Sequence, residues 1–498
     1  MQCVGDPYFL GLFSGALSAL ARRQSIRCDL FVLRSIDAAV GVGLKTWVHR
    51  SFLHSVWFAQ QWVRVYRYLI NARVGYRSVS WGQPWSDLCA LIQAWEVWRR
   101  RPDGSSLEGV RAHGVLIGDL VIDTYIRFRP AATVERNDWF LLYVLWQAFR
   151  DVRRARSYFK RRRPTLYLTS FSSYVQHGVA VRSALLQGIP VICFGNLQQL
   201  GKQLSLQDPY QTKNPVHYRD RFLRRPDQEA AIVHARAQLE GRLRGGIDPA
   251  TAYMATSAYA DDGTEPAPDV DGAVIVFLHD FFDSPHIYAD LVFPDFWTWA
   301  CCTIDTLLAT GKPFAVKAHP NQVAESVSVT EQIRARYPAV RFIAPTVPNT
   351  RLAAAGMRAA VTVYGSVAAE LAYLGVPSIA CARHPHVAFD FCTTARTRDE
   401  YVALLERAHD MSFTDIASTR RQVLEFYAMH NLEGGPDDWA TSAALTGYWR
   451  RCLDPQSDAD TLERALQTLI ASPGFARLVD RLESLILHGT DNTGELSK

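Results

Sequence analysis

Apolar runs alternate with helical patterns through the second half of the chain. Runs of strand length occupy residues 273–278, 314–318, 341–344, 359–364 and 377–380. Between them, apolar residues recur at helical spacing near 296–309, 329–336 and 367–374. Strands separated by helices are typical of parallel βαβ units, so this half is predicted to form a Rossmann-like sheet.

The first half predicts a second α/β domain. Its strand candidates are residues 29–33, 165–169 and 190–194, each followed by helical or loop signals. A polar, acidic, Pro-containing stretch at 259–271 predicts a linker, and the pattern is helical after residue 398. We therefore expect an N-terminal Rossmann-like domain over 1–258, a C-terminal one over 272–397, and a helical segment over 398–498 that packs back across the cleft between them.

Polar side chains follow three of the predicted strands in the second half. The first strand is followed by His279, Asp280, Asp283, Ser284 and His286, the second delivers Lys317, His319 and Asn321, and the fourth delivers Tyr364, Gly365, Ser366 and Glu370. Ligands of open α/β sheets bind outside the carboxyl ends of the strands. If these strands are adjacent and parallel, the three groups line one crevice.

The Gly365-Ser366 corner predicts a nucleotide site. It joins a strand to a helix, and the free backbone N–H groups of a helix N-terminus bind phosphate. Glu370 lies one helical turn further on the same face, where its carboxylate reaches a sugar diol beside that phosphate. The alternative is structural: Ser366 as a simple N-cap, Glu370 as a solvated residue, the sequence at 283–285 as a helix start, and His319 as a loop histidine.

Composition and charge point to a globular protein of two or three domains. The chain has 498 residues, 48% of them apolar, and a net charge of +5. No apolar run reaches the ~18 residues of a membrane span and no signal peptide opens the sequence, which predicts a cytoplasmic protein. Nine cysteines show neither CxxC pairing nor metal spacing, and the DxD triplet at 269–271 precedes its strand. We therefore expect no metal.

The motifs HDFFDSPH, KAHPN and YGSVAAE, each at a strand end, resemble those of bacterial capsule and surface-polysaccharide glycosyltransferases with the GT-B fold. Within that group the chain looks most like the retaining β-Kdo transferases. The resemblance covers residues 273–385, and more loosely 113–128 and 167–195. It implies two Rossmann-like domains facing across a cleft, CMP-Kdo as the donor, and a role in capsule or lipopolysaccharide assembly.

The same resemblance implies roles for individual residues. Asp283 matches the nucleophile, with Asp280 as the nearby alternative, and His319 matches the histidine of the family's HP motif. Ser366 and Glu370 match its nucleotide motif. His279 stands where the family pattern has glutamine, a departure that bears on the donor.

Glycosyl transfer gives these residues a chemical rationale. A carboxylate under the anomeric carbon stabilises the oxocarbenium-like state or forms an adduct, which suits Asp283. His319, Lys317 and the helix N-terminus at Ser366 would neutralise the leaving phosphate. His286 is the candidate base for the acceptor hydroxyl. CMP is already a good leaving group, so the chemistry requires no metal or other cofactor.

The first half is expected to bind the acceptor, a glycan or glycolipid. The candidates are Ser172, Ser173, His177, Asn196, Gln198 and Asp119. For Asp119, which shares a helix face with Asp123 and Arg127, the favoured alternative is an ion-pair row on a solvated surface.

A basic run raises the question of a membrane. Eight of the fourteen residues from Arg150 to Arg163 are Lys or Arg. Such a run attracts anionic headgroups or a phosphorylated lipid acceptor, which would place the protein at the inner face of the cytoplasmic membrane. The alternative is a solvated helix face. No nucleic-acid motif accompanies the run.

Other functions share this fold. A UDP-sugar epimerase needs further acid and base carboxylates around the sugar ring. A polyol-phosphate transferase would use histidines as bases, and this chain has suitable ones. A catalytically silent scaffold of a polysaccharide-assembly complex is the alternative outside enzymes.

Overall fold

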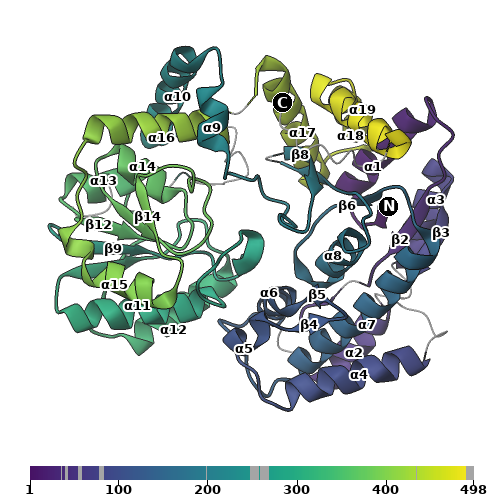
Figure 1. The fold of residues 1–498 in the computed structure, drawn as a ribbon, viewed down its shortest axis with the longest axis horizontal. Helices are drawn as coiled ribbons and strands as arrows, with labels where there is room; N and C mark the ends of the chain where they lie inside the picture. Colours follow the sequence, from purple (N-terminus) through teal and green to yellow (C-terminus); the bar gives the residue numbers. More distant parts are fainter. Residues whose placement is uncertain are drawn as a thin grey trace. The chain divides into compact units, whose positions relative to one another are not determined.

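The computed structural model describes residues 1–34, 36–39, 43–53, 59–77, 84–197, 199–246, 257, 259, 269–432 and 434–488 (Figure 1). The chain divides into two compact units. Unit 1 comprises Met1–Arg129, Val134–Thr212 and Gly435–Lys498, and unit 2 comprises Pro130–Thr133 and Lys213–Gly434. Each unit combines helices with parallel strands, so the expected α/β fold class is confirmed.

Unit 2 is built on one parallel sheet. Its strands are β9 (Val274–Phe277), β10 (Phe314–Lys317), β11 (Arg341–Ile343), β12 (Ala359–Val361), β13 (Ser378–Ala380) and β14 (Cys392–Thr394). Their order is β11-β10-β9-β12-β13-β14, and every neighbouring pair is parallel. Val276 of β9 is in register with Val316 of β10 and Val361 of β12, so the carboxyl ends of these three strands lie at the same edge.

Helices cover both faces of this sheet. They are α9 (Tyr218–Leu223), α10 (Gln228–Leu243), α11 (Phe296–Thr310), α12 (Ala324–Arg336), α13 (Asn349–Ala354), α14 (Val367–Tyr373), α15 (Arg398–Glu406) and α16 (Ile416–His430). Side chains alternate along β9: Val276 enters a core with Trp299 of α11, and Ile275 enters the opposite core with Leu371 of α14. This period of two explains why the strand is apolar throughout.

The unit boundaries differ from those expected from the sequence. Residues 213–246 belong to unit 2 because Phe222 of α9 and Leu239 of α10 are buried with Phe426 of α16. The helices after residue 398 divide between the units, since α15 and α16 cover unit 2 while α17 (Pro436–Leu453), α18 (Ala459–Ile470) and α19 (Pro473–His488) belong to unit 1. Of the expected linker, only Tyr259 and residues 269–271 lie among the described residues.

The described residues of unit 1 form two three-stranded sheets and a short hairpin. The first sheet is parallel and has the order β1 (Gln2–Cys3), β2 (Asp29–Val32), β3 (Arg73–Arg77). In the second, β6 (Tyr167–Thr169) pairs parallel with β7 (Val191–Asn196), which pairs antiparallel with β8 (Gln199–Leu204). The hairpin is β4 (Arg111–Ala112) with β5 (Val115–Leu116). The side chain of Gln2 links the two sheets, because its Oε1 accepts hydrogen bonds from Thr169 Oγ1 at 2.8 Å and from the Ser170 backbone N–H at 2.9 Å.

The longest helix among the described residues is α7 (Trp139–Arg162) of unit 1, with 24 residues. The helices of unit 1 that precede residue 213 are α1 (Pro7–Ala21), α2 (Leu44–Leu53), α3 (Ala59–Ile70), α4 (Pro84–Trp98), α5 (Gly104–Glu108), α6 (Gly118–Phe128), α7, the π-helix η2 (Tyr174–Gly178) and α8 (Val179–Leu185). Phe13 of α1 is buried in one core with Leu445 of α17 and Leu482 of α19. No helix among the described residues combines the length and the apolar character needed to cross a membrane.

Candidate functional site

The predicted donor residues of unit 2 gather at the carboxyl edge of its sheet. Lys317 ends β10, and His279 and Tyr364 follow β9 and β12. The rings of His279 and Tyr364 lie 4.7 Å apart, and His279 Nε2 lies 3.1 Å from Thr362 Oγ1. The parallel register therefore brings all three predicted groups to one edge, as expected from the strand pattern.

Lys317 is the most unusual residue at this edge. Its side chain is 1% exposed, and burial lowers the pKa of its ammonium to about 8. Among the described residues no acidic group or hydrogen-bond acceptor pairs with this ammonium, which lies 6.0 Å from the centre of the Phe277 ring. A buried charge without a partner is costly, and such perturbed groups concentrate at functional sites.

Two histidines at this edge are held neutral. Burial, with a smaller contribution from the neighbouring His319, lowers the pKa of His279 to about 3. Burial also lowers the pKa of His319, although Asp280 acts in the opposite direction. His319 Nδ1 accepts a hydrogen bond from the Asn321 backbone N–H at 3.2 Å, so its Nε2 carries the proton in the neutral ring. His319 is thus suited to donate a hydrogen bond to an anion.

The two aspartates after β9 differ in their surroundings. Asp280 is buried, and its carboxylate accepts hydrogen bonds from Phe282 N at 2.9 Å, Val323 N at 2.9 Å and Ser326 Oγ at 2.8 Å. These bonds tie the loop after β9 to the start of α12. Asp283 is exposed on the same loop. A carboxylate with three protein donors is a poor nucleophile, so Asp280 is unsuited to that role.

Three further predicted residues, Ser284, His286 and Asn321, lie on the loops that follow β9 and β10. Ser284 is buried, and its carbonyl oxygen accepts a hydrogen bond from the Tyr364 hydroxyl at 3.3 Å. His286 is half-buried in a short 3₁₀ turn, Pro285–Ile287, and acts on the pKa of Asp295. Asn321 is half-buried on the loop after β10. These placements keep all three near the predicted site.

The Gly365-Ser366 corner lies between β12 and α14, but the serine is not a conventional cap. Ser366 has helical dihedral angles, and its exposed side chain makes no capping hydrogen bond to α14. The Gly365 backbone N–H donates to Thr362 Oγ1 at 3.2 Å, and a Cβ at Gly365 would lie 2.8 Å from that oxygen. The corner therefore requires glycine, and the Ser366 hydroxyl faces solvent.

Glu370 is engaged by residues that sequence reasoning missed. Its side chain is 5% exposed, its Oε1 lies 2.7 Å from Arg242 Nε of α10, and its Oε2 accepts a short hydrogen bond from the Tyr259 hydroxyl. The interpretation of Glu370 as a solvated helix residue is wrong, because α10 covers this face of α14. A sugar diol would have to displace Tyr259 or Arg242 to reach the carboxylate.

The predicted acceptor residues of unit 1 lie at the carboxyl ends of β6 and β7. Ser172 and Ser173 are buried just after β6, and the Ser172 backbone N–H donates to Gln211 Oε1 at 3.0 Å. His177 Nδ1 lies 2.6 Å from Gln2 Nε2, and burial lowers the pKa of this histidine to about 4. Asn196 ends β7 and is half-buried. Gln198 lies outside the described residues.

Asp119 is not part of a solvated ion-pair row, so that interpretation is wrong. Both Asp119 and Asp123 are buried on α6. The Asp119 carboxylate receives two hydrogen bonds from the Arg182 guanidinium of α8, one of them 2.6 Å long from Nη1 to Oδ1. Because this pair uses both carboxylate oxygens, Asp119 is unsuited to bind an acceptor sugar.

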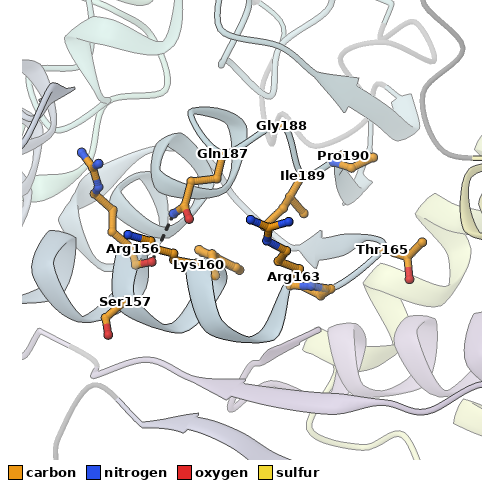
Figure 2. Close-up of a pocket in the computed structure, with 11 residues that line it drawn as sticks. Arg156, Ser157, Lys160, Arg163, Thr165, Gln187, Gly188, Ile189 and Pro190 are labelled. Atoms are coloured by element: carbon orange, nitrogen blue, oxygen red, sulfur yellow. Dashed lines mark hydrogen bonds between the residues drawn. The ribbon is translucent and has the colours of Figure 1, made fainter.

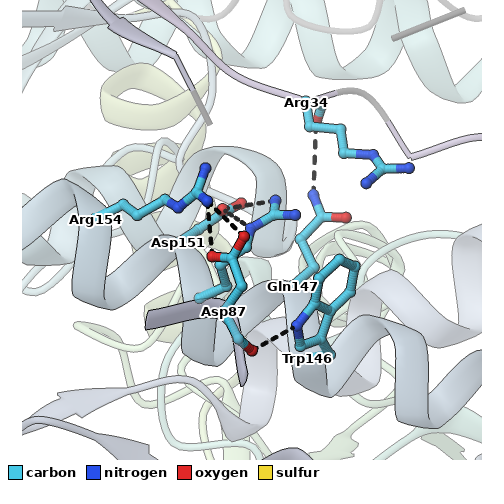
Figure 3. Close-up of polar contacts among 7 residues, drawn as sticks. Arg34, Asp87, Trp146, Gln147, Asp151 and Arg154 are labelled. Carbon is cyan, nitrogen blue, oxygen red and sulfur yellow. Dashed lines mark hydrogen bonds and ion pairs between the residues drawn. The ribbon is translucent and has the colours of Figure 1, made fainter. Parts of the chain in front are cut away.

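The basic run is not a single surface. Arg150 and Arg154 are buried, and they pair with Asp151 at 2.8 Å and with Asp87 at 2.6 Å, respectively. Figure 3 shows Asp87 of α4 between Arg154 and the Trp146 indole, which donates to the Asp87 carbonyl oxygen at 3.2 Å. The interpretation of the whole run as a solvated or lipid-facing surface is therefore wrong for Arg150 and Arg154. The exposed cations are Lys160, Arg161, Arg162 and Arg163.

A hollow of about 850 Å³ lies next to these cations (Figure 2). Its lining includes Arg156, Lys160 and Arg163 from the end of α7, and residues 187–190 from the turn between α8 and β7. Thr165 and Pro190 of its wall precede β6 and β7, so the hollow lies at the amino ends of these strands. That is the edge opposite the predicted acceptor residues.

Comparisons with known proteins leave the family open. No protein-family model matches the sequence, and no curated protein matches it significantly. Among solved structures, a co-structure of S. aureus MnaA with UDP covers 92% of this chain and 98% of its own, at 9% identity and a TM-score of 0.26. A match this distant supports no functional statement.

Proposed function

We propose that the carboxyl edge of the unit 2 sheet binds the phosphate of a nucleotide sugar and that the protein is a glycosyltransferase. The observation that carries this is Lys317, a buried ammonium without a counter-charge in the described structure. An anionic ligand would supply the missing partner and favour the charged form of the lysine. His319, with its donor on Nε2, and the exposed Ser366 hydroxyl add donors at the same edge.

The transfer step follows from the exposed carboxylate on the loop after β9. Asp283 attacks the anomeric carbon as its bond to the nucleotide phosphate breaks, which gives a covalent adduct. The acceptor hydroxyl then displaces Asp283 and passes its proton to His286, so the configuration is retained. Lys317 and His319 stabilise the negative charge on the departing phosphate.

The resemblance of the strand-end motifs supports a particular donor and acceptor. We propose that the donor is CMP-Kdo and that the acceptor is a glycan or glycolipid of bacterial capsule or lipopolysaccharide assembly. Ser172, Ser173, His177 and Asn196 are the acceptor candidates in unit 1. The exposed cations from Lys160 to Arg163 would contact anionic headgroups at the inner face of the cytoplasmic membrane.

One observation favours a second candidate function. Two neutral histidines, His279 and His319, lie beside the proposed phosphate position. A polyol-phosphate transferase would use such histidines to activate an acceptor hydroxyl. Preference for CMP over UDP would distinguish a CMP-sugar transferase from a UDP-sugar epimerase, and binding of no nucleotide would favour a catalytically silent scaffold.

Calorimetry with CMP, CDP, UDP and GDP tests the proposal. Lys317→Met should lose nucleotide binding. The control variant Lys312→Met should retain it, because Lys312 lies just before β10, is exposed and pairs with Asp410 at 3.9 Å. Preference for CMP would support a CMP-sugar donor. Preference for UDP or another diphosphate would contradict CMP-Kdo, and binding of none would favour the scaffold.

A further inference from the structure

A second group of unusual side chains lies in unit 2 and consists of residues other than those proposed to bind the nucleotide. His384 and His386 belong to the loop between β13 and β14, and Cys392 is the first residue of β14. One ligand atom of each residue lies within 4.8 Å of the other two, and all three side chains are buried. Phe426 of α16 packs edge-on against His386, so the group lies between the edge strand and this helix.

The histidine nitrogens of this group lack partners. Within the described part of the chain, His384 Nδ1 and both ring nitrogens of His386 make no hydrogen bond, although each is fully buried. A buried polar atom without a partner costs about 1–3 kcal/mol, and native structures keep few of them. Three such nitrogens in two stacked rings, whose centroids are 3.8 Å apart, require an explanation.

We propose that His384, His386 and Cys392 bind a zinc ion. Imidazole and thiolate are the ligands that Zn²⁺ prefers among protein side chains. A carboxylate-preferring cation such as Mg²⁺ does not suit this set.

The hydrogen bond at the other ring nitrogen of His384 is consistent with zinc binding. Its Nε2 lies 2.5 Å from Thr394 Oγ1, which leaves Nδ1 as the ligand atom. Metal-binding histidines are usually oriented by a hydrogen bond at their other nitrogen. Thr394 of β14 therefore acts as the residue that positions His384.

Zinc binds neutral imidazole and thiolate, so binding deprotonates the Cys392 thiol. Binding forms the zinc–sulfur bond and releases that one proton to solvent.

Binding also draws the group together. Zinc bonds of about 2.0–2.3 Å place tetrahedral ligand atoms roughly 3.3–3.8 Å apart. The present spread of up to 4.8 Å therefore contracts, which ties the loop between β13 and β14 to the edge strand. The described residues supply three ligands, and a fourth completes the tetrahedral coordination that zinc prefers.

Metal titration of the full-length chain, stripped of metal by a chelator, tests this site. One equivalent of Zn²⁺ should bind with release of one proton, measured by calorimetry in buffers of different ionisation enthalpy. Co²⁺ should give the intense near-ultraviolet absorption of a cobalt–thiolate bond. A wild-type chain that binds neither metal at one equivalent, or binds without the thiolate band, overturns the proposal.

Variants locate the site. Cys392→Ser should remove the thiolate band, and Thr394→Val should weaken binding about 10–100-fold. Cys89→Ser and Cys381→Ser should change neither result, since the first thiol is exposed and the second is buried outside the group. If Cys392→Ser does not fold, the Thr394→Val result and the wild-type spectrum decide. A band that survives in Cys392→Ser, or vanishes in Cys89→Ser, contradicts the assignment.

Discussion

The Arg242 guanidinium and the Glu370 carboxylate form a buried ion pair, with 2.7 Å between Nε and Oε1. The pair joins α10 to α14, the helix that begins at the proposed phosphate corner. It also gives Glu370 a structural role that competes with binding of a sugar diol. Loss of nucleotide binding in a Glu370 variant is therefore informative only when its folding is measured as well.

Removing one member of this pair should destabilise unit 2. Arg242→Met leaves a buried carboxylate without its cation, and we expect the free energy of unfolding to fall by about 3–5 kcal/mol. Denaturant titration measures this loss. The double variant with Glu370→Gln should recover part of it, because no uncompensated charge then remains. Equal losses in the single and double variants would contradict the pairing.

Lys317 predicts a rise in stability at alkaline pH. Its pKa of about 8 is below the ordinary 10.5, so the unfolded chain binds more protons between these values. The free energy of unfolding contributed by this group should increase as pH rises from about 8 towards 10.5. The same difference predicts that Lys317→Met stabilises the protein by about 3 kcal/mol at pH 7.

Denaturant titrations at pH 7 and pH 10 compare wild type with Lys317→Met. The advantage of the variant should be present at pH 7 and shrink at pH 10. Lys312→Met should show no such change, because its side chain is exposed. A Lys317 variant that is less stable than wild type at pH 7 would show that the ammonium has a partner.

The Asp119–Arg182 pair should contribute to unit 1 rather than to acceptor binding. Asp119→Ala leaves the Arg182 guanidinium buried and unpaired, with an expected loss of about 3–5 kcal/mol. At a temperature where the variant is folded, its KM for acceptor should match that of wild type. A raised KM without a stability change would restore the acceptor role.

A variant of Asp283 should lose activity and keep its stability, whereas a variant of Asp280 should lose stability. Asp283→Asn should lower transfer by about 10³-fold or more, as loss of a nucleophile does, with stability within about 0.5 kcal/mol of wild type. Asp280→Ala should lower stability by about 1–3 kcal/mol, because it leaves Val323 N and Ser326 Oγ without an acceptor. Full transfer by Asp283→Asn would falsify the adduct mechanism.

The exposed end of the basic run should control membrane binding. Each cation near an anionic leaflet contributes about 1 kcal/mol. Replacing Arg161, Arg162 and Arg163 with Gln should therefore lower partitioning onto phosphatidylserine vesicles about 10²-fold in a sedimentation assay. The matched control replaces Arg99, Arg100 and Arg101, which are also exposed. Equal binding by both triple variants would exclude a specific membrane contact through the α7 end.

The strands and helices of unit 2 were predictable because their signals are local. Apolar runs at 273–278 and 314–318 became β9 and β10, and the Gly365 corner lies where the pattern changes from strand to helix. The convergence of Lys317 with the residues after β9 was also predictable. Parallel strands bring their carboxyl ends to one edge, whatever the packing on the faces.

The partners of the charged side chains were decided only by the tertiary structure. Glu370 and Arg242 are 128 residues apart, and nothing local shows that α10 covers α14. The same holds for Asp119 with Arg182, and for the division of the C-terminal helices between two units. The H-x-H spacing of His384 and His386 was visible in the sequence, but its approach to Cys392 depends on the pairing of β13 with β14. Periodicity determines which residues form an element, whereas the choice of neighbours depends on which apolar faces bury each other.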